Sequence, residues 1–277
     1  MAVTGRDGRQ RPLAVVLLSG GMDSAVAAAT AARTYRLACL HATYRQRTAN
    51  RERVCFGALA HHFEATHRLV IDLGYLARIG GSALTDPGIP VPDASPASET
   101  IPVTYVPFRN ANLLAAAVSW AEALGAEAVI IGAVEEDSSG YPDCRQAFCD
   151  AFARAVDEGT RPTTHVRLLT PVIHASKAEI VRSGVALGLP FHLTWSCYRS
   201  ESVPCRRCDS CRLRREGFAG AGVDDPLDHG VVPPAVEGSL DQGVAPSPME
   251  GAASRSRAII DRLKGFLATV GPSRGRS

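Results

Sequence analysis

The feature that most constrains the fold is a short apolar run that passes directly into a glycine-rich loop. Residues 13–18 read LAVVLL, residues 19–24 read SGGMDS, and an alanine-rich segment follows through Arg33. An apolar run of this length is typical of a buried parallel strand. The alanine-rich segment predicts a helix. A strand that enters a helix through a tight loop is a unit of an α/β fold.

The same alternation of strand and helix continues along the chain. Further strands are predicted at 37–43, 68–73, 126–133 and 166–172. Helices are predicted at 50–64, 112–124, 144–157 and 176–187, where Ser176 and Glu179 form a capping-box pattern. Strands that alternate with helices predict a Rossmann-like parallel sheet with helices on both faces.

Composition divides the chain into four parts. We predict a flexible N-terminus at 1–12, an α/β domain at 13–193 and a cysteine-rich segment at 194–225. Residues 226–277 are rich in Pro, Gly and Ser and predict a flexible tail, with one possible amphipathic helix at 254–270. A loop of similar composition from Gly80 to Pro102 interrupts the α/β domain. Loops of this length are usually functional or disordered.

Charge and hydropathy exclude several classes of protein. The net charge of the 277 residues is only +2, which gives no indication of a nucleic-acid partner. No apolar run reaches the length of a membrane span, and the polar N-terminus does not resemble a signal peptide. We therefore expect a cytoplasmic protein without a membrane or nucleic-acid partner. Its eight cysteines then need a purpose other than disulfides.

The glycine-rich loop predicts a phosphate site. Gly20 and Gly21 let backbone N–H groups approach phosphate oxygens, and the following helix start favours negative charge. Asp23 is a candidate to hold Mg²⁺ against the phosphates. The loop is neither a Walker A motif nor a dinucleotide fingerprint. The alternative to a phosphate site is a structural Gly-Gly turn with an Asp or Ser helix cap. The predicted ATP-binding residues are Leu18, Ser19, Gly20, Gly21, Met22, Asp23, Ser24, Ala25, Val26, Ala27 and Ala28.

Four of the cysteines predict a metal site. Cys197, Cys205, Cys208 and Cys211 have the spacing C-x7-C-x2-C-x2-C. Four thiolates satisfy tetrahedral Zn²⁺ in a closed structural site, so we expect one zinc ion without a catalytic role. The alternatives are an iron–sulfur cluster, a redox pair and unligated thiols.

The loop and several further strings carry a resemblance to known families. SGGxDS after the first strand resembles the PP-loop ATP pyrophosphatases. The further strings are SALT (82–85), YVP (105–107) with Arg109-Asn110, SGYPDCR (139–145), SKAEIV (176–181), TWSCY (194–198) and CxxCDSCxLR (205–214). In this order they resemble the 7-cyano-7-deazaguanine synthase family, from about residue 13 to about residue 226.

The resemblance implies a reaction. ATP would activate 7-carboxy-7-deazaguanine, ammonia would form an amide, and a second activation would give the nitrile. It also implies a homodimer. The catalytic candidates are Asp23, Arg109 and Lys177, of which the two cations would hold pyrophosphate. The substrate candidates are Asp137 or Asp143 for the guanine-like edge, Tyr141 for stacking and Arg145 for the carboxylate. Taken singly, each of these residues could also be a surface or structural residue.

The chain departs from the family pattern at three places. The usual Asp-Tyr-Gly-Gln-Arg-His after the second strand is Thr43-Tyr44-Arg45-Gln46-Arg47-Thr48. Phe108 replaces a glycine and Ser138 a tyrosine. We expect these changes to affect substrate preference or pathway, so that the product serves either queuosine or a deazapurine natural product.

Two other functions are compatible with the sequence. One is another PP-loop enzyme that modifies tRNA, which calls for a catalytic cysteine pair and a basic RNA-binding face. The other is a nucleotide-binding module without catalysis. Intact Asp23 and Lys177 argue against the module.

Overall fold

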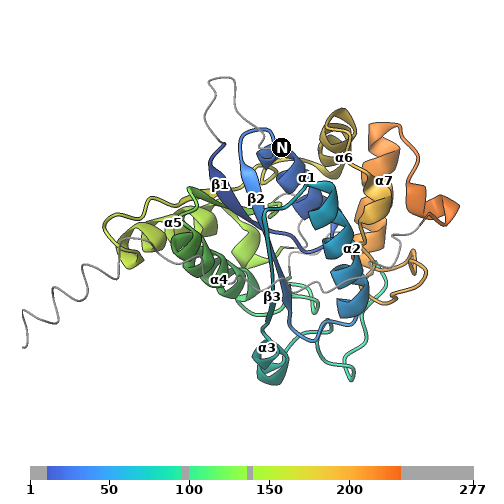
Figure 1. The fold of residues 1–277 in the computed structure, drawn as a ribbon. Coiled ribbons are helices and arrows are strands. Elements are labelled where there is room, and N and C mark those ends of the chain that lie inside the picture. Colours follow the sequence, from blue (N-terminus) through green and yellow to red (C-terminus); the bar gives the residue numbers. More distant parts are fainter. Residues whose placement is uncertain (1–10, 95–99, 136–139, 232–277) are drawn as a thin grey trace, which may run out of the picture. The chain divides into compact units, whose positions relative to one another are not determined.

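The described part of the chain is built on a five-stranded parallel sheet in the order β3-β2-β1-β4-β5. Figure 1 labels its strands β1, β2 and β3. The computed structural model describes residues 11–94, 100–135 and 140–231. The predicted α/β fold is confirmed, while the helix predicted at 254–270 lies outside the described residues. The strands are β1 Leu13–Leu17, β2 Arg36–Thr43, β3 His67–Asp72, β4 Ala128–Ile131 and β5 Arg167–Leu169.

Helices cover both faces of the sheet because alternate residues of the central strand point to opposite faces. Ala14 and Val16 pack in one cluster with Val26, Phe56 and Ile180. The helices of this face are α1 Met22–Ala31, α2 Ala49–His62, α6 Lys177–Ala186 and α7 Asp209–Ala221.

The second face lies against two helices, α4 Arg109–Leu124 and α5 Gln146–Gly159. Val15 and Leu17 pack there with Leu114, Ala117 and Cys149. Both faces of β1 are therefore apolar and buried, as its unbroken hydrophobic sequence predicted.

Several element boundaries differ from the prediction. Helix α4 begins at Arg109, three residues before the predicted Asn112, so Arg109 is the first residue of the helix. Strand β5 is shorter than predicted and ends before Pro171, which has no N–H to donate to a sheet. Helices α3 Tyr75–Ile79 and α7 were not predicted as helices.

The long loop packs against the cysteine-rich segment. Ala83, Leu84 and Val91 share a buried cluster with Trp195 and Cys208. Two polar contacts add to this packing. Arg199 pairs with Asp93 at 2.6 Å, and the backbone N–H of Ala94 donates to the carbonyl of Arg207 at 2.7 Å.

The packed part of the chain continues past residue 226. Pro226–His229 form a 3₁₀ helix, and Leu227 is buried in the same cluster as the cysteines. Asp225 forms a buried ion pair with Arg214 of α7, with 2.6 Å between Oδ2 and Nε. These residues therefore pack with the cysteine-rich segment, although the sequence placed 226–231 in the tail.

Candidate functional site

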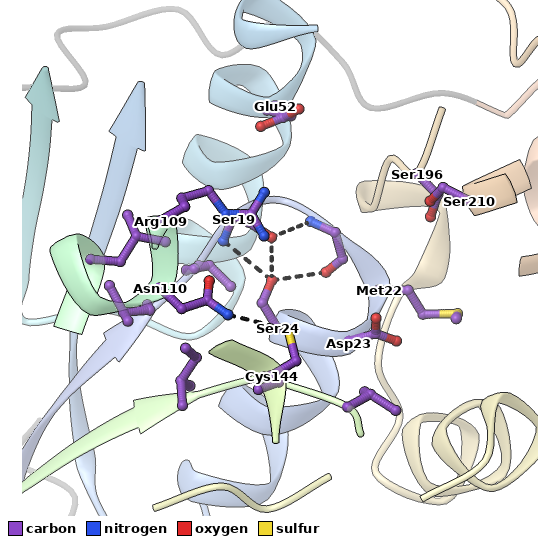
Figure 2. Close-up of a pocket in the computed structure, with 18 of the residues that line it drawn as sticks. Ser19, Met22, Asp23, Ser24, Glu52, Arg109, Asn110, Cys144, Ser196 and Ser210 are labelled. Atoms are coloured by element: carbon purple, nitrogen blue, oxygen red, sulfur yellow. Dashed lines mark hydrogen bonds between the residues drawn. The ribbon is translucent and has the colours of Figure 1, made fainter. Parts of the chain in front are cut away.

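The glycine-rich loop is held in shape by its own two serines. The Ser24 hydroxyl donates to the Gly21 carbonyl at 3.0 Å, and the Gly21 N–H donates to Ser19 Oγ at 3.1 Å (Figure 2). The two hydroxyl oxygens lie 2.9 Å apart. The serines therefore brace the loop, which leaves backbone N–H groups at the start of α1 as its natural anion donors.

Two glycines permit the close approach of neighbouring elements to this loop. Gly20 has φ +88°, and a Cβ there would lie 2.7 Å from the carbonyl oxygen of Glu52 in α2. A Cβ on Gly132, directly after β4, would lie 2.6 Å from Ser24 Cα. Sequence analysis missed Gly132, although a glycine at the end of a buried strand indicates close backbone contact.

Asp23 and Lys177 form an ion pair beside the loop. Lys177 Nζ lies 2.8 Å from Asp23 Oδ2, and the Lys177 side chain is only 11% exposed. The capping box of Ser176 and Glu179 is confirmed and places Lys177 at the first position of α6. The alternative of a solvated lysine does not describe this residue.

Asp23 also meets one requirement of a cation ligand. Its Oδ1 is buried and accepts no hydrogen bond from the described residues. An orphaned carboxylate oxygen at a phosphate loop fits the oxygen coordination of Mg²⁺.

Arg109 extends into the same cavity from the start of α4. Its Nη1 donates to the Tyr44 hydroxyl at 3.1 Å. Burial opposes its charge, but Tyr44, Tyr141, Cys144 and Asp143 hold the pKa of Arg109 above its ordinary value. The guanidinium therefore stays charged at any physiological pH.

One cavity of about 250 Å³ joins these groups. The predicted residues that line it are Leu18, Ser19, Gly21, Met22, Asp23, Ser24, Arg109, Tyr141, Lys177 and Cys197. Five predicted ATP-binding residues do not line it and are buried, namely Gly20, Ala25, Val26, Ala27 and Ala28. Other lining residues had no role assigned from the sequence, and they include Tyr44, Glu52, Asn110, Gly132, Cys144, Trp195, Ser196, Tyr198, Ser210 and Arg214.

The predicted substrate residues separate into different environments. Tyr141 lines the cavity and donates to Thr104 Oγ1 at 2.8 Å. Asp143 is buried and accepts from the backbone N–H of Asn110 at 2.8 Å, so it fixes the first turn of α4. Arg145 is exposed and is not part of the cavity lining. Asp137 and Ser138 lie outside the described residues.

The four predicted cysteines converge on one point. Their sulfur atoms all lie within 4.8 Å of one another. Tetrahedral coordination at a metal–sulfur distance of about 2.3 Å requires sulfurs about 3.8 Å apart. Backbone N–H groups of Arg199 and Cys205 approach Cys197 Sγ at 3.4 and 3.3 Å, as expected around metal-bound thiolates. The cluster could therefore hold a metal ion.

The thiols of this cluster share protons through their own hydrogen bonds. Bonds from Cys208 and Cys211 lower the pKa of Cys197. The bond to Cys197 raises the pKa of Cys208 to about 11, and the bonds to Cys197 and Cys208 raise the pKa of Cys211. A bound cation would replace these protons, which is the usual chemistry of a thiolate site.

The cysteine-rich segment contacts the phosphate loop directly. The backbone N–H of Trp195 donates to the Gly20 carbonyl at 2.9 Å. The guanidinium of Arg51 in α2 lies 5.1 Å from the centre of the Trp195 ring system. Arg214 donates to Thr194 Oγ1 at 2.8 Å, which ties α7 to the same segment.

These features define an α/β enzyme of the PP-loop type that carries a four-cysteine cluster against its phosphate loop. Residues 13–222 match the family described as queuosine biosynthesis protein QueC, and the chain belongs to that family. Within the described residues, no helix has both the length and the apolar character that crossing a bilayer requires.

Individual relatives agree with this assignment. The 7-cyano-7-deazaguanine synthase of Chlorobaculum parvum is 53% identical over 221 residues, which cover 79% of this chain and 97% of the relative. The enzyme of the same name from Chlorobium luteolum is 52% identical over 225 residues, or 81% and 99% of the two chains. The resemblance inferred from the sequence is confirmed.

Proposed function

We propose that this chain is an ATP-dependent ligase that converts 7-carboxy-7-deazaguanine and ammonia into 7-cyano-7-deazaguanine. The substrate carboxylate attacks the α-phosphorus of ATP and displaces pyrophosphate. Ammonia then displaces AMP and forms the amide. The amide oxygen is adenylated by a second ATP, and loss of AMP and protons leaves the nitrile.

One observation carries the proposal beyond family membership. The loop, the Asp23–Lys177 pair and Arg109 line a single cavity at the carboxyl edge of the sheet, where open α/β sheets bind ligands. Backbone N–H groups of the loop hold the phosphates. Lys177 and Arg109 stabilise the charge that develops on the departing pyrophosphate.

The two metals have separate roles in this proposal. Mg²⁺ bound with ATP would be held by Asp23 and would neutralise phosphate charge. Zn²⁺ at the four cysteines would be structural, because four thiolates leave no open coordination position. The cluster would then fix the segment that contacts Gly20.

The proposal also includes the substrate contacts, the location, the oligomeric state and the pathway that the resemblance implies. Tyr141, which lines the cavity, contacts the heterocycle. The resemblance also suggested Arg145 for its carboxylate and Asp137 or Asp143 for its donor edge, but Arg145 and Asp143 do not line the cavity and receive no contact in this proposal. The protein acts in the cytoplasm as a homodimer, on small molecules alone. The departures at Thr43, Thr48, Phe108 and Ser138 tune the choice between queuosine and another deazapurine product.

Mass spectrometry of the product tests the reaction. With 7-carboxy-7-deazaguanine, ATP and ammonium we expect 7-cyano-7-deazaguanine, with two AMP and two pyrophosphate released for each nitrile. ATP binding without turnover would contradict the proposal and favour a non-catalytic module. A rate that depends on added tRNA would favour a tRNA-modifying enzyme.

A further inference from the structure

Glu52 is the second acid of the cavity and has no part in the roles assigned above. Among the described residues that line the cavity, the two carboxylates are Asp23 and Glu52. Asp23 is paired with Lys177. Glu52 lies in the first turn of α2, with its main-chain carbonyl packed against Gly20. In Figure 2 the Glu52 side chain and Asp23 lie on different sides of the Ser19–Ser24 hydrogen bonds.

Two neutral donors hold the Glu52 carboxylate in one orientation. Gln46 Nε2 donates to Oε2 at 2.8 Å, and Thr48 Oγ1 donates to Oε1 at 2.7 Å. Gln46 is fixed in turn, because its Oε1 accepts from the Tyr44 N–H at 2.8 Å. Gln46 and Thr48 are both buried. Each oxygen of the Glu52 carboxylate therefore has a lone pair left for a further donor. The two hydrogen bonds already fix the plane of the carboxylate.

The surroundings favour a ligand that brings donors. Burial raises the pKa of Glu52, and the hydrogen bonds from Gln46 and Thr48 only partly oppose this effect. The Arg109 guanidinium on the same cavity wall donates to the Tyr44 hydroxyl. Two adjacent N–H groups of a ligand would stabilise the carboxylate without adding a charge.

We propose that Glu52 recognises the edge of the substrate heterocycle that carries two neighbouring N–H donors. This inference rests on the proposed function. In a 2-aminopyrimidin-4-one ring, the ring N–H and the exocyclic amino group point the same way, about as far apart as the two oxygens of a carboxylate. Asp143 is less suited, because it is engaged with the start of α4 and does not line the cavity.

The substitution Glu52→Gln tests the proposal, because glutamine keeps the shape but replaces one acceptor with a donor. The KM for 7-carboxy-7-deazaguanine should rise about 10- to 100-fold, while the KM for ATP changes less than about twofold. Glu64→Gln, an exposed position just after α2, is the matched control and should match the wild type. Thermal unfolding of both variants checks that the fold is intact.

A second measurement separates recognition from a structural role. An analogue without the 2-amino group should be a poorer substrate than 7-carboxy-7-deazaguanine for the wild type, by about 10-fold or more. Glu52→Gln should lose most of this discrimination. Unchanged discrimination, or an equal rise in both KM values, would overturn the proposal.

Failure of the proposed function gives a different result. If the wild type turns over neither substrate, the reaction assignment is wrong. Calorimetric binding of the same two heterocycles to wild type and Glu52→Gln then decides the role of Glu52. Equal affinity of the two proteins for the amino-bearing heterocycle would refute it.

Discussion

The ammonium of Lys177 has a defined partner and little contact with water, so its loss should affect the reaction directly. In Lys177→Ala, we expect kcat/KM for pyrophosphate release to fall about 10²- to 10³-fold, because developing phosphate charge loses a fixed cation. Initial rates of pyrophosphate release at substrate concentrations well below KM measure this effect. Arg154→Ala, an exposed cation on α5, serves as control. A loss of less than threefold in Lys177→Ala would exclude Lys177 from the site.

His41 should make the stability of the protein depend on pH. The ring stacks on Phe56, its Nδ1 lies 3.1 Å from the Leu18 carbonyl, and burial lowers its pKa to about 4. Below about pH 6.5, His41 becomes protonated in the unfolded chain, whereas in the folded chain it stays neutral down to about pH 4. The free energy of unfolding should therefore fall over this window, by about 3 kcal/mol in total.

Urea unfolding at several pH values between 7.5 and 4 measures the His41 effect. His41→Asn offers the comparison, because its amide can still donate to the Leu18 carbonyl but does not titrate. The pH dependence of the variant should be flatter than that of the wild type over this window. Parallel curves would assign the dependence to other groups.

Some residues of the site could be predicted from the sequence and others could not. The phosphate loop and the four cysteines were predictable because each motif is contiguous or nearly so. Glu52 was not, because a lone acid in a polar helical segment looks like surface charge. Arg45 and Phe108, which replace glycines of the family pattern, keep left-handed backbone with φ +62° and +55°. At these two positions the chain adopts a backbone conformation that glycine favours, although the residues carry large side chains.

At the scale of elements, the packing of α7 on α6 positions Lys177. A Cβ on Gly217 would lie 2.9 Å from Lys177 Cβ and 3.0 Å from its carbonyl oxygen. Gly217→Ala should therefore push the two helices apart, destabilise the fold by about 1–3 kcal/mol and reduce kcat. Chemical denaturation and steady-state kinetics measure the two effects.

Gly220 of the same helix provides the control for this prediction. A Cβ there would meet only Ala178 Cβ, at 3.0 Å, and the gain in helix propensity of about 1 kcal/mol offsets that contact. Gly220→Ala should be nearly neutral in stability and rate. Equal effects of the two substitutions would show that Lys177 does not depend on this packing.

The order of strands and helices was predictable from hydrophobic period, while some boundaries were not. Helix α4 begins early because Asp143, from a distant segment, accepts the N–H of Asn110. Helix α7 was missed because its sequence is rich in arginine and begins among cysteines, so it has few apolar residues to mark a face. The first error comes from a tertiary contact that the local pattern does not show, and the second from a segment with little local pattern to read.

At the scale of the whole molecule, the cysteine cluster should couple to the nucleotide site. Removal of the proposed zinc ion by a chelator should lower Tm by roughly 10 °C or more, since a structural metal contributes directly to folding. It should also weaken ATP binding, because Trp195 would no longer hold Gly20. Metal analysis, thermal unfolding and ATP titration measure these effects.

Tryptophan fluorescence gives this coupling a second readout. The chain has two tryptophans, so Trp120→Phe leaves Trp195 as the reporter. Its emission should change on chelation and recover when zinc is restored. Cys149→Ala, outside the cluster, should respond to chelator like the wild type. Unchanged emission and ATP affinity after metal loss would contradict the coupling.

The pairing of Asp23 with Lys177 has a consequence for synthesis of the chain. These partners lie 154 residues apart in sequence. At roughly 5–20 residues per second, a ribosome needs roughly 8–30 s to make the second partner after the first. During that interval the nascent loop has neither its lysine nor the tryptophan that holds Gly20. The site is therefore completed only after Lys177 and Trp195 have both been made, so that nucleotide bound there cannot stabilise the chain before that point.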